Sequence, residues 1–206
     1  MKKAIYLVGG GGHCASAIDI IEQEDKFRIA GILDSPGKIG KKVLGYEIIG
    51  DESEIKKYAK TDNYFLITMG HIKTCRQRRQ LAEKISAFGG RLARVLSPHA
   101  YISKHSRIGS GTIVGHDAIV SAGVSTGINC IIATKAVIEH NVRLGDYCHI
   151  STCAVVNGES RLGNGVFVGS NAMIRQRLKI GEKCVVGAGV NVFQDLPSKS
   201  YLKFIR

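Results

Sequence analysis

An aliphatic side chain recurs at every sixth position through the second half of the chain, from Ile102 to Val192. A period of six fits neither an α-helix, whose apolar face repeats every 3.6 residues, nor a simple strand with alternating faces. It fits a parallel β-helix in which each hexad forms one flat side and three sides close a coil. The sixteen positions, fifteen of them aliphatic, predict about five coils of 18 residues. They are Ile102, Ile108, Val114, Val120, Thr126, Ile132, Ile138, Leu144, Ile150, Val156, Leu162, Val168, Ile174, Ile180, Val186 and Val192.

Small residues occupy two further places in the hexads. The second position is Gly at 109, 115, 127, 145, 163, 169, 181 and 187, and the fifth is small or apolar, as at Ala118, Cys130, Ala136 and Cys184. We expect the first and fifth residues to point into the prism and the glycines to form its tight corners.

The first 97 residues show a different pattern, in which apolar strand-like runs alternate with helical ones. This order predicts a small α/β unit with a parallel, Rossmann-like sheet. The expected strands are 4–8, 28–33, 64–69 and 92–96, and the expected helices are 14–24, 52–60 and 72–88. Because proline disfavours helix in the residue before it, we place the domain boundary near Ser97-Pro98. Residues 1–97 then form the α/β domain, and residues 98–206 the β-helix with a short C-terminal tail.

Composition narrows the class of protein. The 206 residues are 44% hydrophobic and 22% charged, as in ordinary globular proteins. No apolar run approaches the roughly 20 residues of a transmembrane helix, and the apolar stretch at 4–8 is too short for a secretory signal. We therefore expect a cytoplasmic protein without a membrane span. The six cysteines form no C-x-x-C pair and show no zinc-ligand spacing, so no metal site is expected. A cytoplasmic address argues against disulfides.

The formal net charge is +12 and is spread over both halves of the chain. Such a field attracts polyanionic small molecules such as nucleotides and coenzyme A. By charge alone it would also attract nucleic acid, but with 6% aromatic residues, no Trp and no recognition motif, nucleic acid is not expected as a partner.

A glycine-rich loop, Gly9 to Ala15, lies between the first expected strand and helix. Backbone N–H groups at such a place can hold an anion. From Gly10 the loop also satisfies G-x-G-x-x-A, and Asp34 follows the second strand where a dinucleotide-binding fold has its ribose-binding acid. An NAD-dependent dehydrogenase is thus one alternative, although no separate catalytic domain remains for it. A plain tight turn is another.

The two halves together resemble the bacterial sugar acetyltransferases with a left-handed β-helix. These comprise nucleotide-activated 4-amino-sugar N-acetyltransferases and the related sialic acid O-acetyltransferases. The resemblance covers nearly the whole chain and is carried by segments 9–13 (GGGGH), 45–51 (GYEIIGD), 97–100 (SPHA), 137–140 (VIEH) and 149–151 (HIS). It implies the left-handed β-helix, a homotrimer, and acetyl-CoA as co-substrate in the groove between neighbouring subunits.

The resemblance also implies that the first domain binds the nucleotide-linked sugar rather than NAD. The matching residues lie at the carboxyl ends of the expected strands, where open α/β sheets bind ligands. They are Gly11, Gly12, His13, Asp34, Gly70 and His71.

His140 matches the general base of the family. Acetyl transfer needs a base for the attacking group and a hydrogen-bond donor for the oxyanion of the tetrahedral intermediate. Residue 158 lies 18 residues after His140, hence one coil further on and about 4.8 Å away. It is Gly158, whose N–H a thioester could approach closely, so we assign the oxyanion contact to it. A corner glycine without that role is the alternative.

Three further residues match positions that line the coenzyme A site in the family, namely His149, Ser170 and Ala188. The chain departs from the family in two places. Relatives carry Asp or Glu directly after the catalytic histidine, whereas this chain has Asn141, which brings no charge to orient the ring and predicts a weaker base. Relatives also end in V-x-G-x-P-A near the coenzyme, whereas residues 196–206 here read LPSKSYLKFIR. Lys199 or Lys203 is the candidate for the phosphates instead.

Taken together, these observations predict an acetyl-CoA-dependent N-acetyltransferase for a nucleotide-activated 4-amino-4,6-dideoxyhexose, in surface glycan or glycoprotein biosynthesis. O-acetylation of a sialic-acid-like sugar is the alternative that uses the same machinery. A γ-type carbonic anhydrase shares the β-helix, but the chain lacks that family's H-x4-H pair. A covalent route through Cys148 is disfavoured, because its hexad position points into the core. A non-catalytic scaffold stays open.

Overall fold

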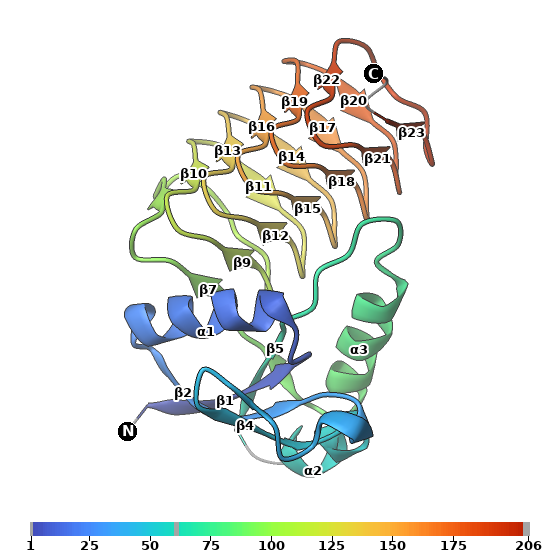
Figure 1. Cartoon of the computed structure of the whole chain (residues 1–206). Helices are drawn as coiled ribbons and strands as arrows, with labels where there is room; N and C mark the ends of the chain where they lie inside the picture. Colours follow the sequence, from blue (N-terminus) through green and yellow to red (C-terminus); the bar gives the residue numbers. More distant parts are fainter. Residues whose placement is uncertain (1, 60–61, 204–206) are drawn as a thin grey trace.

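The computed structural model describes residues 2–59 and 62–203 and has two parts, an α/β domain followed by a left-handed parallel β-helix (Figure 1). The sheet of the first domain has the order β3-β4-β2-β1-β5-β6 and is parallel except for the β3–β4 pair. Its strands are β1 (Lys3–Val8), β2 (Phe27–Leu33), β3 (Lys42–Val43), β4 (Tyr46–Gly50), β5 (Tyr64–Ile67) and β6 (Arg91–Leu92). Its helices are α1 (Gly12–Glu24), α2 (Ile55–Ala59) and α3 (Arg76–Ala87), with short 3-10 turns at Pro36–Lys38 and Glu52–Glu54.

Helices cover both faces of this sheet, because the strand residues alternate between two apolar clusters. Ile5 and Leu7 of β1 pack with α1, whereas Val8 packs with α2 and α3. α1 lies between the sheet and the β-helix (Figure 1), and Ile113 of the β-helix belongs to the cluster that α1 lines. The second domain therefore completes the core of the first.

Several expectations for the first domain are corrected. The expected strand 92–96 is two strands: β6 pairs with β5, whereas β7 (Val95–Leu96) pairs with β9 in the β-helix. The expected helix 72–88 begins only at Arg76. The strands β3 and β4 at one side of the sheet were not expected. The expected strand 64–69 ends at Ile67. The expected helix 52–60 is a 3-10 turn at Glu52–Glu54 followed by α2, and its residue 60 lies outside the described residues.

The β-helix has three faces, each a parallel sheet. A strand pairs with the strand 18 residues later along the chain, except that the last strand, β23, comes 16 residues after its partner β21. The first face consists of β7 (Val95–Leu96), β9 (Ile113–Val114), β12 (Ile131–Ile132), β15 (His149–Ile150), β18 (Phe167–Val168), β21 (Val185–Val186) and β23 (Tyr201–Leu202). The second consists of β8 (Tyr101–Ile102), β10 (Ile119–Val120), β13 (Val137–Ile138), β16 (Val155–Val156), β19 (Met173–Ile174) and β22 (Asn191–Val192). The third consists of β11 (Ser125–Thr126), β14 (Arg143–Leu144), β17 (Arg161–Leu162) and β20 (Lys179–Ile180).

The inward positions are confirmed. First and fifth hexad residues from Val114 to Val192 form one continuous buried cluster inside the prism. Thr126, the one first-position residue that is not aliphatic, accepts a hydrogen bond from the N–H of Gly109 through Oγ1 at 3.0 Å. Ser160, a buried fifth-position residue, donates its hydroxyl to the carbonyl of Arg175 at 2.9 Å. The two polar interruptions are thus satisfied inside the wall, as burial requires.

The expectation that second-position glycines form the corners is wrong. The positive φ values fall on the fourth position of the hexads, and most of those residues carry a side chain, such as Asn141 (φ 58°) and Glu159 (φ 62°). The second-position glycines are required by close approach between coils. A Cβ on Gly109, for example, would lie 2.1 Å from the carbonyl oxygen of Gly127.

Candidate active site

His140 lies on the exposed corner between the second and third faces, two residues after β13 ends. Gly158 occupies the same corner one coil further on, and the predicted proximity of the two residues is confirmed. A Cβ on Gly158 would lie 2.6 Å from both Cε1 and Nε2 of the His140 ring. The imidazole therefore fills the space that a side chain at 158 would need. Gly158 lines the hollow described below, and its N–H donates to no acceptor within residues 2–59 and 62–203.

Asn141 contacts the other side of the imidazole. Its amide nitrogen donates to Nδ1 of His140 at 3.3 Å. A base that works through Nε2 needs its proton on Nδ1. The terminal torsion of an asparagine side chain is broad and roughly two-fold. A half-turn of the Asn141 amide about this torsion would let Oδ1 accept a hydrogen bond from the Nδ1 proton.

The hollow at His140 has a volume of about 340 Å³. Its lining is polar and comes from three successive coils: Glu139, His140, Asn157, Gly158, Glu159, Gln176 and Arg177. The Glu139 carboxylate accepts from the backbone N–H of His140 at 3.2 Å and does not contact the ring. Arg177 donates to both carboxylate oxygens of Glu159 at 3.1 and 3.2 Å, which fixes one wall. This pair was missed in the sequence, although its spacing of 18 residues places the two side chains on neighbouring coils.

A second cluster joins the two domains on the first face, where His149 meets His13 and His71. The ring of His149 lies 5.5 Å from that of His71 and 6.4 Å from that of His13. Its Nδ1 donates to the carbonyl of His71 at 2.8 Å, which leaves Nε2 as an acceptor in the neutral ring. Gly70 packs against the same ring, since a Cβ there would lie 3.5 Å from Cε1 of His149.

Burial keeps these three rings neutral. It lowers the pKa of His13 and of His149 to about 4, and the pKa of His71 to about 3, with a smaller effect from the positive charge of Arg78 nearby. Both ring nitrogens of His71 and Nε2 of His13 are buried without a hydrogen-bond partner. Polar groups left unsatisfied in this way mark a site rather than a packed core.

Arg78 of α3 positions this cluster and was missed in the sequence, where it looked like one more surface cation of the helix. It is 1% exposed. Its guanidinium donates to the carbonyls of Ile67 and Met69 at the end of β5, and to the carbonyl of Asn129 in the β-helix at 2.8 Å. Burial lowers the pKa of Arg78 to about 10, which still leaves it charged at neutral pH. One side chain thus ties the loop that carries Gly70 and His71 to the β-helix.

The expected substrate residues of the first domain fall in two places. Gly11 caps α1 and, like Gly12, has open space where a side chain would be. Asp34 instead lines a separate cavity of about 460 Å³, and its Oδ2 accepts from the N–H of Gly10 at 2.6 Å and from Lys38 at 3.0 Å. Burial would raise the pKa of Asp34, but the hydrogen bonds from the N–H groups of Ser35 and Gly10 and from Lys38 outweigh it and lower the pKa.

The expected coenzyme residues lie on the opposite side of the second face from His140. Ser170 and Ala188 occupy the corner between the first and second faces, and the Ser170 hydroxyl contacts that of Ser151 at 3.0 Å. One chain therefore does not bring Ser170, Ala188 and His149 together with His140. Lys203 lies over the ring of Tyr201 at 5.4 Å, near the end of the described chain.

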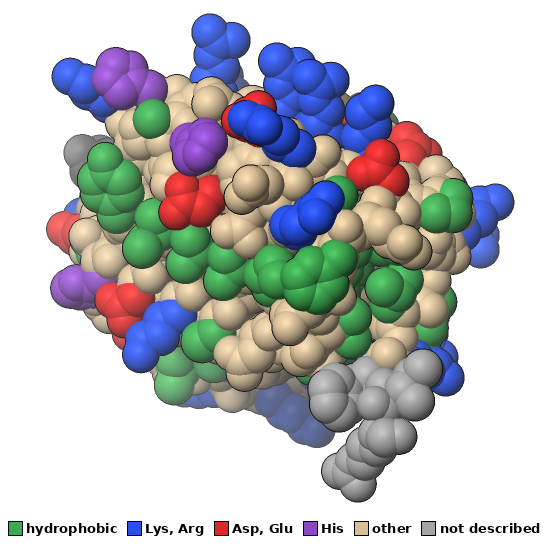
Figure 2. Space-filling view, turned by 90° about the horizontal axis from the view of Figure 1, so that it is seen from above, with side chains coloured by type: hydrophobic (Ala, Val, Ile, Leu, Met, Phe, Trp, Pro, Cys, Tyr) green, Lys and Arg blue, Asp and Glu red, His purple; other side chains and the backbone are tan. Residues whose placement is uncertain are grey.

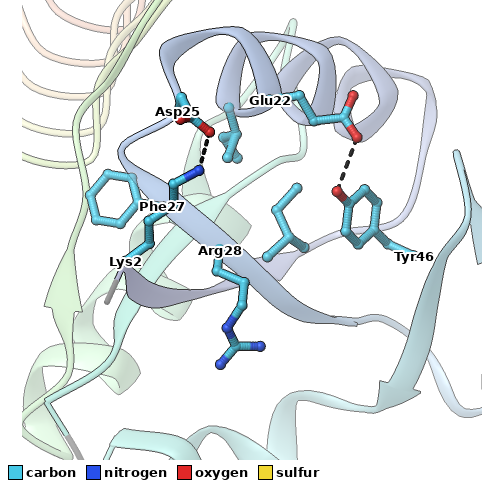
Figure 3. Close-up of a pocket in the computed structure, with 8 residues that line it drawn as sticks. Lys2, Glu22, Asp25, Phe27, Arg28 and Tyr46 are labelled. Atoms are coloured by element: carbon cyan, nitrogen blue, oxygen red, sulfur yellow. Dashed lines mark hydrogen bonds and ion pairs between the residues drawn. The ribbon is translucent and has the colours of Figure 1, made fainter.

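The remaining candidates do not form sites of their own. A cavity of about 550 Å³ lies at the start of β2 and the end of α1, where Lys2 pairs with Asp25 and Tyr46 donates to Glu22 (Figure 3). All six cysteines are free. The Cys148 thiol donates to the carbonyl of Gly163 inside the prism at 3.2 Å. Among the described residues no cluster suits a metal ion, and no helix is long and apolar enough to cross a membrane.

Both halves match known families. Residues 4–85 match the PglD N-terminal domain, and residues 159–194 match the bacterial transferase hexapeptide repeat. No curated protein sequence matches the chain.

Several solved structures share the whole architecture. PerB from Caulobacter crescentus, in complex with CoA and GDP-perosamine, is 28% identical, with a TM-score of 0.89 over 96% of this chain and 92% of that one. The acetyltransferase domain of PglB from Neisseria gonorrhoeae, in complex with acetyl coenzyme A, is 25% identical, with a TM-score of 0.89 over 98% and 96%. WeeI from Acinetobacter baumannii, at 18% identity and a TM-score of 0.86 over 97% and 96%, shows the same fold.

Proposed function

We propose that this chain belongs to the hexapeptide-repeat bacterial sugar acetyltransferases with a PglD-type N-terminal domain, and that it transfers the acetyl group of acetyl-CoA to the amino group of a nucleotide-linked amino sugar. The sugar is of the 4-amino-4,6-dideoxyhexose type, and the product serves surface glycan or glycoprotein biosynthesis. The observation that carries the proposal is the His140 ring seated over Gly158 on an exposed corner. Relatives that share this fold over nearly the whole chain hold CoA with GDP-perosamine, or acetyl coenzyme A.

The proposed reaction is a direct transfer. The sugar amine attacks the thioester carbonyl, and Nε2 of His140 accepts the proton that the amine loses. The oxyanion of the tetrahedral intermediate accepts a hydrogen bond from the free N–H of Gly158. Collapse of the intermediate forms the amide, breaks the carbon–sulfur bond and releases coenzyme A, whose thiolate takes the proton from His140. Glycine at 158 suits this arrangement because a Cβ there would lie 2.6 Å from the His140 ring and displace the base.

The sugar nucleotide is proposed to bind at the first domain. The open N-terminus of α1 at Gly11, Gly12 and His13 presents free N–H groups that suit a phosphate. Gly70 and His71 form the neighbouring loop, held by Arg78. Asp34 lines the adjacent cavity for the nucleoside.

We also propose that the active protein is a homotrimer. Outward residues of the second face form an apolar stripe of Tyr101, Ile119, Val137, Val155 and Met173, visible as a row of hydrophobic side chains (Figure 2). The side chains of Tyr101 and Ile119 are 63% and 39% exposed. A continuous apolar patch with this exposure is typical of a surface that packs against another protein chain. Second faces packed around a three-fold axis would bring the Ser170 corner of one copy to the His140 corner of the next. The coenzyme residues at the Ser170 corner of one copy would then lie beside His140 of the next, although a single chain keeps the two corners apart.

A cytoplasmic location fits this proposal, because the six free cysteines suit a reducing compartment.

Product analysis tests the reaction. The purified protein is incubated with acetyl-CoA and, separately, with UDP-, dTDP- and GDP-linked 4-amino-6-deoxy sugars, with sialic acid and with its CMP form, and products are identified by mass spectrometry. The mass gain of one acetyl group on an amino sugar, abolished in His140→Ala, is the expected result. A gain only on the sialic acids would establish O-acetylation instead, and no gain on any sugar would overturn the proposal.

Complementation tests the shared site. His140→Ala and His149→Ala chains, each inactive alone, are mixed during refolding or coexpressed. In a cyclic trimer each site takes His140 from one copy and His149 from its neighbour, so random mixing restores about a quarter of the sites. Mixtures that stay inactive would place the whole site within one chain.

A further inference from the structure

The third face of the β-helix carries a ladder of three cations. Arg143 pairs with Arg161, and Arg161 pairs with Lys179, on three successive coils. All three side chains are exposed, and none makes a hydrogen bond or ion pair within residues 2–59 and 62–203. Lys and Arg side chains gather along one edge of the molecule as seen from above (Figure 2). We call Arg143, Arg161 and Lys179 the basic ladder.

Like charges directly opposite one another across strands destabilise a sheet. The strands are about 4.8 Å apart, so the basic ladder stacks three positive charges within about 10 Å. The nearby carboxylates are engaged elsewhere. Glu159 pairs with Arg177, Asp146 accepts from the N–H of Ile128, and Asp195 accepts from the backbone of Lys179 rather than from its ammonium group. Within the described part of the chain, no carboxylate therefore forms an ion pair with the basic ladder.

The equivalent outward positions of the other two faces are mostly apolar. On the first face they include Ile131 and Val185, both buried, and on the second they form the apolar stripe. The hexad pattern alone therefore does not require cations at these positions. An anionic ligand that neutralises these cations would relieve their mutual repulsion.

The basic ladder adjoins the hollow at His140. It lines a shallow cavity of about 510 Å³ together with Asn141, Glu159, Arg177 and Leu178. Glu159 and Arg177 also line the hollow that holds His140 and Gly158. A molecule that reaches His140 with its reactive end can therefore lay an anionic group on the basic ladder.

We propose that the basic ladder binds the nucleoside diphosphate group of a co-substrate of the same site. This inference rests on the proposed function, in which both co-substrates, acetyl-CoA and the nucleotide-linked sugar, carry a diphosphate ester. Two guanidinium groups in register offer parallel N–H donors that match phosphate oxygens, and Lys179 adds a point charge. In the proposed trimer this third face and the first face of the next copy enclose one groove, so the basic ladder faces the nucleotide loop of its neighbour.

Steady-state kinetics with each co-substrate varied in turn tests the inference. The variant R143Q/R161Q/K179Q is compared with R28Q/K42Q/K56Q, which removes the same charge from exposed cations of the first domain. The ladder variant is expected to raise the KM of one co-substrate at least tenfold at low salt and to flatten the salt dependence of that KM. A higher KM for acetyl-CoA would show that the basic ladder binds the diphosphate of the coenzyme, and a higher KM for the sugar nucleotide would show that it binds the diphosphate of that substrate. Equal KM values in ladder, control and unmodified proteins would overturn the inference.

Calorimetry with nucleotides separates this result from failure of the proposed function. Binding of UDP, GDP and coenzyme A, each of which carries a diphosphate, is measured for the same three proteins. If no sugar is acetylated but only the ladder variant loses at least tenfold affinity for one nucleotide, the basic ladder is supported as a phosphate site and the proposed reaction is overturned. If no nucleotide binds differently to the ladder variant and the control, the basic ladder is not a phosphate site.

Discussion

Substitution of Gly158 by Ala tests whether the contact between His140 and Gly158 organises catalysis. The new methyl carbon would lie 2.6 Å from Cε1 and Nε2 of His140. Carbon atoms in contact need about 3.5–4.0 Å, so the ring must retreat by about 1 Å. His140 is exposed and its ring is the far end of the side chain, so the ring moves more easily than the backbone does.

The consequence is a loss of rate without a loss of fold. A displacement of about 1 Å at a reacting group costs on the order of 100-fold in rate. The backbone at Gly158 does not have the positive φ that favours glycine. Ala there is therefore expected to leave the free energy of unfolding within about 1 kcal/mol.

The assay is kcat for acetyl transfer together with urea denaturation, in single and double variants. Gly158→Ala is expected to lower kcat about 100-fold, and to lower it no further when His140 is already Ala. Unchanged kcat in Gly158→Ala would refute the reasoning. A further tenfold loss in the His140→Ala background would show instead that the methyl obstructs the thioester directly.

Three other changes have defined outcomes. Asn141→Asp is expected to move the acidic limb of the pH–rate profile to higher pH, because a carboxylate can only accept from Nδ1 of His140 and stabilises the imidazolium; an unmoved limb would contradict this. The pKa of His71, lowered by burial to about 3, predicts that the free energy of unfolding decreases as the pH is lowered. Below about pH 6.5 the unfolded chain binds a proton at this histidine that the folded chain does not, which costs about 1.4 kcal/mol of stability per pH unit. His71→Leu should accordingly lose less stability than the unmodified protein between pH 7 and 5 in urea titrations, and equal losses would contradict the assignment. Arg78→Met leaves three carbonyls without their donor and should lower the free energy of unfolding by about 3 kcal/mol or more, whereas a loss below about 1 kcal/mol would show that the guanidinium does not hold the domains together.

The β-helix was predictable because its period is a geometric property of the chain. The coils repeat every 18 residues as far as β22, so the inward residues, the core and the placement of Gly158 beside His140 all followed from counting. The same counting did not reveal why glycine occupies the second hexad position. The close approach that excludes a Cβ at Gly109 is made by the backbone of the next coil and leaves no trace in the local pattern.

The junction between the domains was not predictable by such counting. Arg78 has the sequence surroundings of a surface residue, and only the packing of α3 against the β-helix buries it. Val95 and Leu96 continue an apolar run that could join either sheet, and only the tertiary fold assigns them to the β-helix. The unsatisfied nitrogens of His71 likewise exist because two distant segments meet around the ring.

The three faces of the prism are built from the same hexad and differ in their outward residues. The outward residues of the first face carry His149 toward the nucleotide loop, those of the second form the apolar stripe, and those of the third form the basic ladder. If the second faces meet at a three-fold axis, each groove is bounded by a first face and by the third face of another copy. His140 and the basic ladder then act on the groove opposite to the one that their own His13 and His71 line. In mixed trimers, a chain with ladder substitutions should therefore impair the same sites as His140→Ala, and should spare the sites that its own first domain serves.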